Sequence, residues 1–301
     1  MNGFDDLFVK DEEKKDGNKF QKEDKPFDKD AWVEKKKQER ADAYALIDEG
    51  TEAITQDCEK FRDYLNVQAR FDRYSVSNAI LIAHQMPEAT KLADFNTWKN
   101  AGVNIKKGES AITMLEPGSE YTREDGSTGF SVNTKKVFDI SQTSNAEARM
   151  TRRKPDERTA LKALVSSAPC KVTLIEQKIE GDAKYSIDKN TIFITKGLSA
   201  DRIFKSLSRE ISASKMIQRG TEGDVAFNAE CSSFILCERY GFDTGDFNFD
   251  DVKRHYLGMD NKEVRKDLGD IRTIANEVSQ DMSRNIEEAD KARKARDNEA
   301  R

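Results

Sequence analysis

The chain has 301 residues, which is enough for two modest domains that each bury a core. Only 36% of the residues are apolar and another 36% are charged, and no apolar stretch approaches the roughly 18 residues of a membrane span. The net charge of −5 argues against a uniformly basic nucleic-acid binder. We therefore expect a cytoplasmic protein with no membrane contact, in which any surface for nucleic acid is local.

Four cysteines are spread along the chain without any C-x-x-C pair, at Cys58, Cys170, Cys231 and Cys237. In a cytoplasmic protein, cysteines without such pairing are typically reduced and packed as small apolar side chains. We expect no disulfide framework.

Residues 1–30 consist mostly of Asp, Glu, Lys, Gly and Asn, so they bury too little surface to offset the entropy of ordering. We expect a disordered acidic arm there and a first domain at residues 31–150. That domain begins with a stripe of apolar residues at helical spacing. The stripe predicts one long amphipathic helix through Ile47, Ile54, Cys58, Phe61 and Leu65.

The rest of the first domain changes from helical to strand periodicity. The stretches "SVSNAILIAHQM" (75–86) and "DFNTWKNAG" (94–102) predict two shorter helices, the first ending before a proline. The stretches "ESAITML" (109–115) and "GFSVNTKKVFDI" (129–140) predict strands, with a turn-rich connection at 116–129. The first domain should therefore be helices followed by a β-hairpin.

A polar segment at 141–158 lacks periodicity, which is typical of a linker. The second domain is expected at 157–287 and a charged C-terminal tail at 288–301. Within the second domain, the pattern first predicts a helix at 157–167 and strands at 170–176 and 184–195, with a turn at 188–190. It then predicts helices at 200–217 and 224–240 and a long helical run from Val264 to Ile286. The whole chain is predicted to be α+β.

Two carboxylates interrupt the apolar stripes of neighbouring helices in the second domain. Glu210 lies three residues after Leu207, and Glu230 lies three residues after Phe227. A carboxylate that points toward a core is costly unless it is paired, hydrogen-bonded or bound to a metal, although one at the edge of a stripe can reach water. Two of them on consecutive helices favour a shared polar site.

The order of two strands, a helix with a Glu and a helix reading "NAECSSFILCERYGFDT" resembles the zincin-like domain of ArdC-type antirestriction proteins of plasmids and conjugative elements. In that family the first helix holds H-E-x-x-H and the second A-E-S, which implies two His and one Glu as zinc ligands and the motif's own Glu as general base. On this resemblance Glu210 matches the base and Glu230 the third ligand. Arg209 and Ala213 stand at the histidine positions.

The resemblance therefore implies a degenerate site. Ala213 has no donor atom, and the permanent charge of Arg209 repels a cation. We expect no catalytic residue, no metal and no other cofactor, and an ion pair between Arg209 and Glu230 in the space of the zinc. The two histidines, His84 and His255, lie at no matching position, and we expect His255 to be exposed and structurally neutral.

Residues 41–143 are similar to the N-terminal domain of the same family. The patterns R-Y-S-x-x-N, Q-x-P-x-A-T, W-x-x-x-G-x-x-x-K-K-G and V-F-D-I-S-Q-T occur there in order. The resemblance implies binding of single-stranded DNA without strong sequence preference. Val103 stands where members commonly have Arg, which removes one basic contact.

Single-strand binding needs cations for the phosphates and exposed rings for base stacking. The candidate DNA-binding residues are Arg70, Arg73, Tyr74, Asn78, Trp98, Lys99, Lys106 and Lys107, with Phe71 and Phe95 as further rings. Rings at helical spacing are often core residues instead. A lysine pair before Gly108 can equally be a solvated loop.

We therefore expect a single-stranded DNA-binding protein of a mobile element or phage, with an antirestriction-type role and an inactive zincin-like domain. In that case residues 31–150 should bind DNA without the second domain. Two alternatives stay open. One is a metallopeptidase with a non-standard metal site, and the other is a protein-interaction module that acts on a host restriction or conjugation protein.

Overall fold

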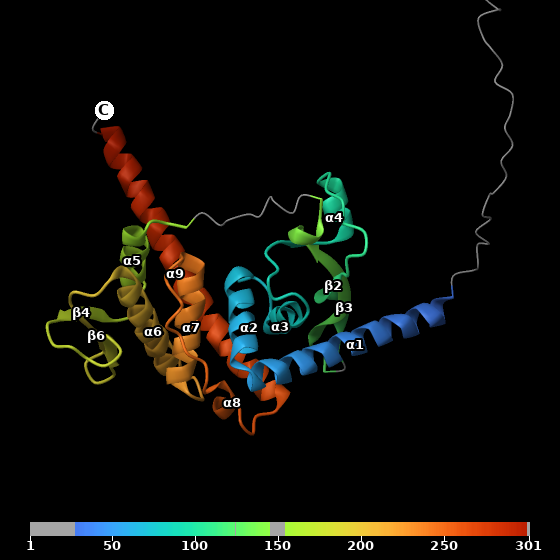
Figure 1. Ribbon diagram of the computed structural model, residues 1–301, viewed down its shortest axis with the longest axis horizontal. Helices are drawn as coiled ribbons and strands as arrows, with labels where there is room; N and C mark the ends of the chain where they lie inside the picture. Colours follow the sequence, from blue (N-terminus) through green and yellow to red (C-terminus); the bar gives the residue numbers. More distant parts are fainter. Residues whose placement is uncertain (1–27, 124, 145–153, 300–301) are drawn as a thin grey trace, which may run out of the picture.

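The computed structural model describes residues 28–123, 125–144 and 154–299. The chain combines helices with two small sheets of three strands each, which confirms the predicted α+β class (Figure 1). Most of the predicted acidic arm lies outside the described residues. Within the described part of the chain, no helix is both long and apolar enough to cross a membrane.

The first half contains three helices, a small sheet and two short helical turns. Its elements are α1 (Lys29–Gln56), α2 (Cys58–Arg70), α3 (Val76–Gln85), β1 (Leu92–Ala93), α4 (Phe95–Asn100), β2 (Ile112–Thr122), β3 (Thr128–Asp139) and η2 (Ile140–Gln142). The strands are antiparallel in the order β1-β3-β2.

The predicted long helix is two helices, α1 and α2. The chain turns at Asp57, whose φ of −142° is extended and whose carboxylate accepts hydrogen bonds from the N–H groups of Glu59 and Lys60. An Asp at this position caps a new helix N-terminus. The prediction of one helix was wrong because the apolar stripe continues across the break, with Ile54 and Phe61 both buried.

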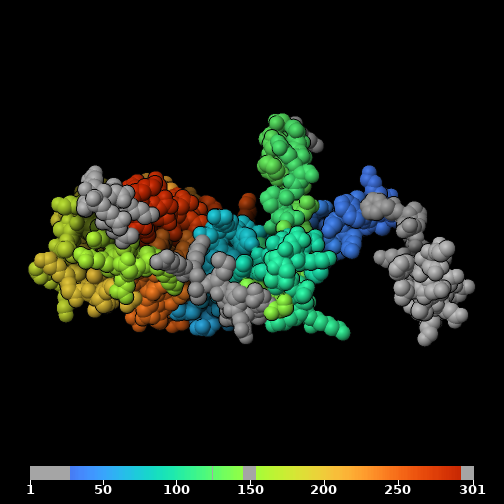
Figure 2. All heavy atoms as spheres, turned by 90° about the horizontal axis from the view of Figure 1, so that it is seen from above, coloured from blue at the N-terminus to red at the C-terminus, as the bar shows by residue number. Residues whose placement is uncertain are grey.

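The hairpin of β2 and β3 is longer than the strand pattern predicted. Strand β2 continues to Thr122 and β3 already begins at Thr128, with Tyr121 opposite Gly129 and an irregularity between Pro117 and Glu120. Figure 2 shows this hairpin standing out from the body of the protein. The outer part of the hairpin is exposed on both faces, so its residues need not alternate between apolar and polar. The alternation that predicts a half-buried strand is therefore not expected there.

The second half contains a mixed sheet packed on a layer of helices. Its elements are α5 (Glu157–Ser166), β4 (Lys171–Ile175), β5 (Ala183–Ser186), β6 (Thr191–Thr195), α6 (Ala200–Arg219), α7 (Val225–Tyr240), α8 (Val252–His255) and α9 (Asn261–Glu299). The strand order is β4-β6-β5, in which β4 is parallel and β5 antiparallel to β6. Helix α9 runs through most of the segment that was expected to be a tail.

One core cluster includes residues of both halves. The ring of Phe61 on α2 lies 5.7 Å from that of Phe227 on α7 and 5.5 Å from that of Phe249. Arg62 donates hydrogen bonds to the carbonyl oxygens of Thr244 (3.3 Å) and Phe247 (2.5 Å). Helix α2 therefore buries its apolar face against the second half of the chain, beside α7 (Figure 1).

Candidate nucleic-acid groove and remnant zincin site

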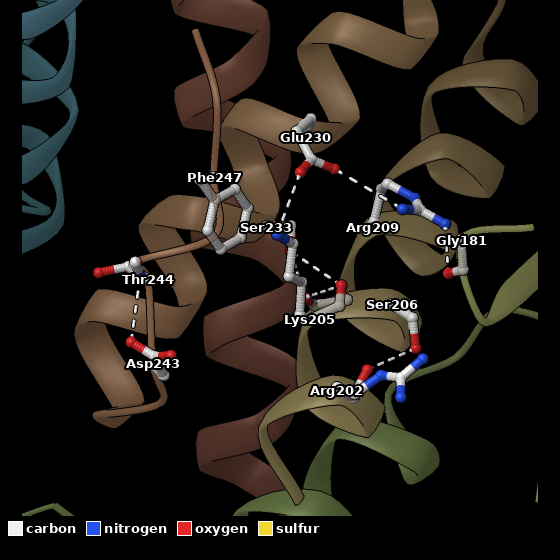
Figure 3. A network of polar contacts seen from close by, with 12 residues as sticks. Gly181, Arg202, Lys205, Ser206, Arg209, Glu230, Ser233, Asp243, Thr244 and Phe247 are labelled. Atoms are coloured by element: carbon white, nitrogen blue, oxygen red, sulfur yellow. Dashed lines mark hydrogen bonds and ion pairs between the residues drawn. The ribbon is translucent and has the colours of Figure 1, made fainter. Parts of the chain in front are cut away.

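Charged side chains meet between α6 and α7 (Figure 3). Glu230 on α7 lies 3.8 Å from Nη1 of Arg209 and 3.8 Å from Nζ of Lys205, both on α6. Arg209 also donates from Nε to Glu210 at 3.0 Å. The side chains of Arg209 and Glu230 are 22% and 25% exposed, so water screens their attraction only in part. The expected ion pair between them is confirmed.

Arg209 and Glu210 also hold the edge strand β5. Nη2 of Arg209 donates to the carbonyl oxygens of Gly181 (2.9 Å) and Ala183 (3.3 Å). The backbone N–H of Tyr185 donates to Glu210 at 2.7 Å. An extended peptide that joined this sheet edge would need backbone groups of this kind. Arg209 and Glu210 therefore already occupy one carbonyl and one N–H group of β5, at Ala183 and Tyr185.

Gly181 allows this close approach. Its φ of +70° lies in the left-handed region, and a Cβ there would lie 2.6 Å from Nη2 of Arg209.

The residues between α6 and α7 do not fit a metal ion. Zinc is held by imidazole, thiolate and carboxylate groups, whereas here two carboxylates share the space with the cations of Arg209 and Lys205. Over the described residues, no group of three or more His, Cys, Asp and Glu is arranged to hold a metal. Ala213 packs instead against the small apolar cluster of Met216, Ala229 and Ile274.

His255 is buried, although the sequence led us to expect an exposed side chain. Its side chain is 5% exposed, its Nε2 lies 3.2 Å from Asp267, and its ring stacks on Phe227 at 4.0 Å. Asp267 also accepts hydrogen bonds from Tyr256 (3.0 Å) and Asn228 (2.5 Å). The expectation was wrong because α8 is a single short turn, whose burial no periodicity in the sequence reveals.

A groove of about 870 Å³ lies in the first half, between α1, α3, α4 and the base of the hairpin. Three aromatic side chains line it: Tyr44 (47% exposed), Phe130 (60% exposed) and the half-buried Tyr74. Its volume falls in the range of about 300–1,000 Å³ that is usual for ligand pockets. The rings of Tyr44 and Phe130 are exposed to a ligand, whereas Tyr74 also packs against the core and stacks on Phe71 at 5.4 Å.

The charged lining of the groove is balanced, with Arg73 and Lys135 against Asp94 and Glu116. Lys135 lies 3.1 Å from Asp94 and 3.4 Å from Glu116. Hydrogen bonds from Thr97, followed by that of Lys135, lower the pKa of Asp94 to about 2. Arg73 is exposed, and its guanidinium has no ion pair or hydrogen bond with the described residues. Arg73 is thus the cation that the groove offers to an anionic ligand.

Two of the predicted DNA-binding residues have structural roles instead. Trp98 is 4% exposed and donates from Nε1 to the carbonyl oxygen of Phe138 at 2.9 Å. Both polar atoms of the Asn78 amide pair with the backbone of Leu115 on β2 at 2.8 Å. Neither side chain is available to a base, because a buried ring cannot stack on a ligand and a paired amide has little left to donate.

The remaining predicted residues are divided between the groove and the surface around it. Tyr74 and Arg73 line the groove. Arg70 donates to the carbonyl oxygen of Pro87. Three lysines are exposed outside the groove, namely Lys99, Lys106 and Lys107. Lys106 donates to the carbonyl oxygen of Ser141 at 2.9 Å, which leaves Lys107 as the freer member of the pair.

Sequence reasoning missed Tyr44 and Phe130. Tyr44 lies on the polar face of α1, and Phe130 lies in an exposed stretch of the hairpin. The available signal was that each is a large ring in a strongly polar segment, where a core role is not expected.

Comparisons with known proteins agree with this architecture. Residues 36–163 match the family model of the N-terminal domain of anti-restriction factor ArdC. An uncharacterized protein of Bacillus anthracis, pXO2-81, is 38% identical over 66 residues, which are 22% of this chain and 11% of that protein. The matched segment thus spans about a tenth of that relative's length.

Solved structures of the antirestriction protein ArdC from plasmid R388 have the same fold. The metal-free structure has a TM-score of 0.56 at 15% identity, and the Mn(II)-bound structure has a TM-score of 0.55 at 16% identity. Each comparison covers 79% of this chain and 98% of the other. Residues 36–163 therefore match the ArdC N-terminal domain, and the chain shares the fold of the R388 protein over 79% of its length.

Proposed function

We propose that the protein binds single-stranded DNA in the groove of the first half, in an antirestriction-type role for a mobile element or phage. The observation that carries the proposal is the combination of Tyr44, Tyr74 and Phe130 with the unpaired cation of Arg73 in one groove. Aromatic rings bind bases by stacking, which tolerates any sequence, and a cation beside them binds the backbone.

The composition of the groove favours a single strand over a duplex. Bases can stack on protein rings only when they are unpaired. A duplex would instead require a broad basic face for its closely spaced phosphates, whereas Lys135 is already paired with Asp94 and Glu116. The hairpin that stands out from the body supplies one wall of the groove (Figure 2).

In this proposal the zincin-like domain is catalytically inactive. Arg209 takes the place of a ligand, and Glu210, at the position of the base, is bound to the backbone of Tyr185 and to Arg209. A general base must be free to take a proton from a metal-bound water. These contacts support a structural role for both side chains.

The test is binding of fluorescent oligonucleotides to the full chain, measured by anisotropy. Tyr74→Ala and Phe130→Ala should each weaken binding of a single strand by an amount on the order of 1–3 kcal/mol without changing its salt dependence. Tyr121→Ala is the matched control, since this ring is similarly exposed (49%) but lies outside the groove. Equal loss in all three variants, or equal affinity for duplex and single strand, would contradict the proposal.

Two other functions have distinct signatures. A metallopeptidase with a non-standard site would purify with about one equivalent of bound zinc or manganese and lose it on Glu230→Ala. A protein-interaction module would bind no oligonucleotide and would bind a restriction or conjugation protein tightly. Metal analysis and the anisotropy assay therefore separate the three functions.

A further inference from the structure

A second cavity, of about 640 Å³, lies at the seam between the two halves of the chain. We call it the arginine pocket, because its charged lining consists of Arg73, Arg239, Arg272 and Arg284 with Asp72 as the one carboxylate among its lining residues. Arg73 comes from the α2–α3 loop, and the other three arginines come from α7 and α9. Such an excess of guanidinium groups in one concave site is typical of phosphate recognition.

Two of the arginines are held in place by the backbone of the first half. Arg239 is 8% exposed and donates to the carbonyl oxygens of Gln68 (3.1 Å) and Ala69 (3.2 Å), at the C-terminal end of α2. Arg272 donates to the carbonyl oxygens of Asp72 (3.2 Å) and Tyr74 (2.7 Å). These bonds fix the guanidinium groups before any ligand arrives, which reduces the entropy lost on binding.

Of the two fixed arginines, Arg272 still has donors to offer. A guanidinium carries five N–H groups, and the bonds of Arg272 to Asp72 and Tyr74 use one at Nε and one at Nη2. At the rim, Arg284 is 72% exposed and pairs with the less exposed Asp281, which also pairs with Lys215. Arg73 is exposed and unpaired among the described residues. The pocket thus combines preorganised donors inside with exposed cations at its rim.

We propose that the arginine pocket is a phosphate-binding site, and that it holds a backbone phosphate of the strand whose bases occupy the groove. This inference rests on the proposed function. The link between the two sites is the α2–α3 loop, because Arg73 lines both the groove and the arginine pocket. The carbonyl oxygen of Tyr74, whose ring lines the groove, accepts a hydrogen bond from Arg272 in the pocket.

A consequence is that DNA binding depends on the second half of the chain. Helices α7 and α9 supply three of the four arginines, so the strand would run from the groove across the seam. The zincin-like half would then serve as part of the DNA-binding surface even without catalysis.

The experiment uses the full chain and a labelled oligothymidylate of about 16 nucleotides, the upper end of single-strand site sizes. Arg284→Ala should weaken binding several-fold and reduce the slope of log K against log salt by about 0.7 for each phosphate that the variant no longer neutralises. Arg284→Lys should restore most of the slope. Arg254→Ala is the matched control, since Arg254 is similarly exposed and also forms an i,i+3 pair, with Asp251, outside the pocket. It should leave affinity and slope unchanged.

A second measurement, calorimetry with pyrophosphate, identifies the source of the phosphate. An Arg284→Ala variant that binds the oligonucleotide like the parent would overturn the proposal, and pyrophosphate binding in that case would assign the pocket to a free phosphate ligand. If the parent binds no oligonucleotide, the proposed function fails. In that case, pyrophosphate binding that Arg284→Ala abolishes would still support a phosphate site in the arginine pocket. If the parent does not bind pyrophosphate either, the proposed phosphate site is overturned together with the proposed function.

Discussion

Nη1 of Arg209 lies 3.8 Å from the carboxylate of Glu230, so the guanidinium stands between α6 and α7 (Figure 3). Arg209 reaches Glu210, Gly181 and Ala183 as well. One side chain therefore ties α6 to α7 and to the edge strand β5.

Arg209→Ala should lower the free energy of unfolding by about 1–3 kcal/mol, because the variant lacks the hydrogen bonds of a charged, partly buried donor. The decrease should be smaller than for a fully buried pair, since Lys205 remains 3.8 Å from Glu230. Denaturant unfolding measures it. The control is Lys196→Ala, whose pair with Glu176 is exposed and should be worth about 0–1 kcal/mol. Equal stability of both variants would show that the Arg209 contacts are inert.

A fragment of residues 31–150 should not fold as a stable unit, in contrast to the expectation from the sequence that this segment binds DNA alone. The reason is that Phe61 on α2 packs against Phe227 and Phe249 of the second half. Removing those partners exposes apolar surface that normally offsets chain entropy. Circular dichroism and thermal unfolding of the fragment test this. A cooperative transition like that of the full chain, with unchanged DNA affinity, would contradict it.

Lys107→Ala should weaken binding of single-stranded DNA to all sequences alike and flatten its salt dependence, because the exposed ammonium is available to a phosphate. Lys106→Ala should have the smaller effect, since Lys106 already donates to Ser141. Lys253→Ala, which removes an exposed charge on α8, is the control. An unchanged salt slope in the Lys107 variant would remove this loop from the binding surface.

Cys231 and Cys237 should not react with thiol reagents in the folded protein at about pH 8. Both are fully buried, and burial raises the pKa of the Cys237 thiol to about 12, whereas the reactive species is the thiolate. Cys58 and Cys170 are half-buried and should be modified first, Cys170 slowly because burial raises its pKa too. Mass spectrometry of the labelled protein identifies the sites.

The same burial makes stability dependent on pH. In the unfolded chain the Cys237 thiol ionises near its ordinary pKa of 9.0, well before it does in the folded protein. The unfolded state therefore binds fewer protons above that pKa, so the free energy of unfolding should fall as pH rises through that window. The expected lack of reactivity and the expected pH dependence both require Cys237 to be buried in the folded protein. Labelling of Cys237 faster than global unfolding would therefore contradict both.

The sequence by itself determined the local structure and the match of residues 36–163 to the ArdC N-terminal domain. Periodicity and capping residues specified the order of helices and strands, because helix α6 ends at Gly220 and α7 at Gly241 in the left-handed conformation that glycine adopts most easily. The ion pair of Arg209 with Glu230 was expected from the resemblance, which places both residues at one metal site, and the two groups lie 3.8 Å apart.

Only the tertiary structure decided which rings and cations are available to a ligand. Trp98 and Tyr74 both lie in the segment that carries the family motifs, yet one is buried under β3 and the other lines a groove. The arginine pocket is assembled from Arg73 and from Arg239 and Arg272, which lie far away in the sequence. Burial and long-range proximity depend on how amphipathic faces pack together, and a local pattern specifies that a face is apolar without specifying which partner covers it.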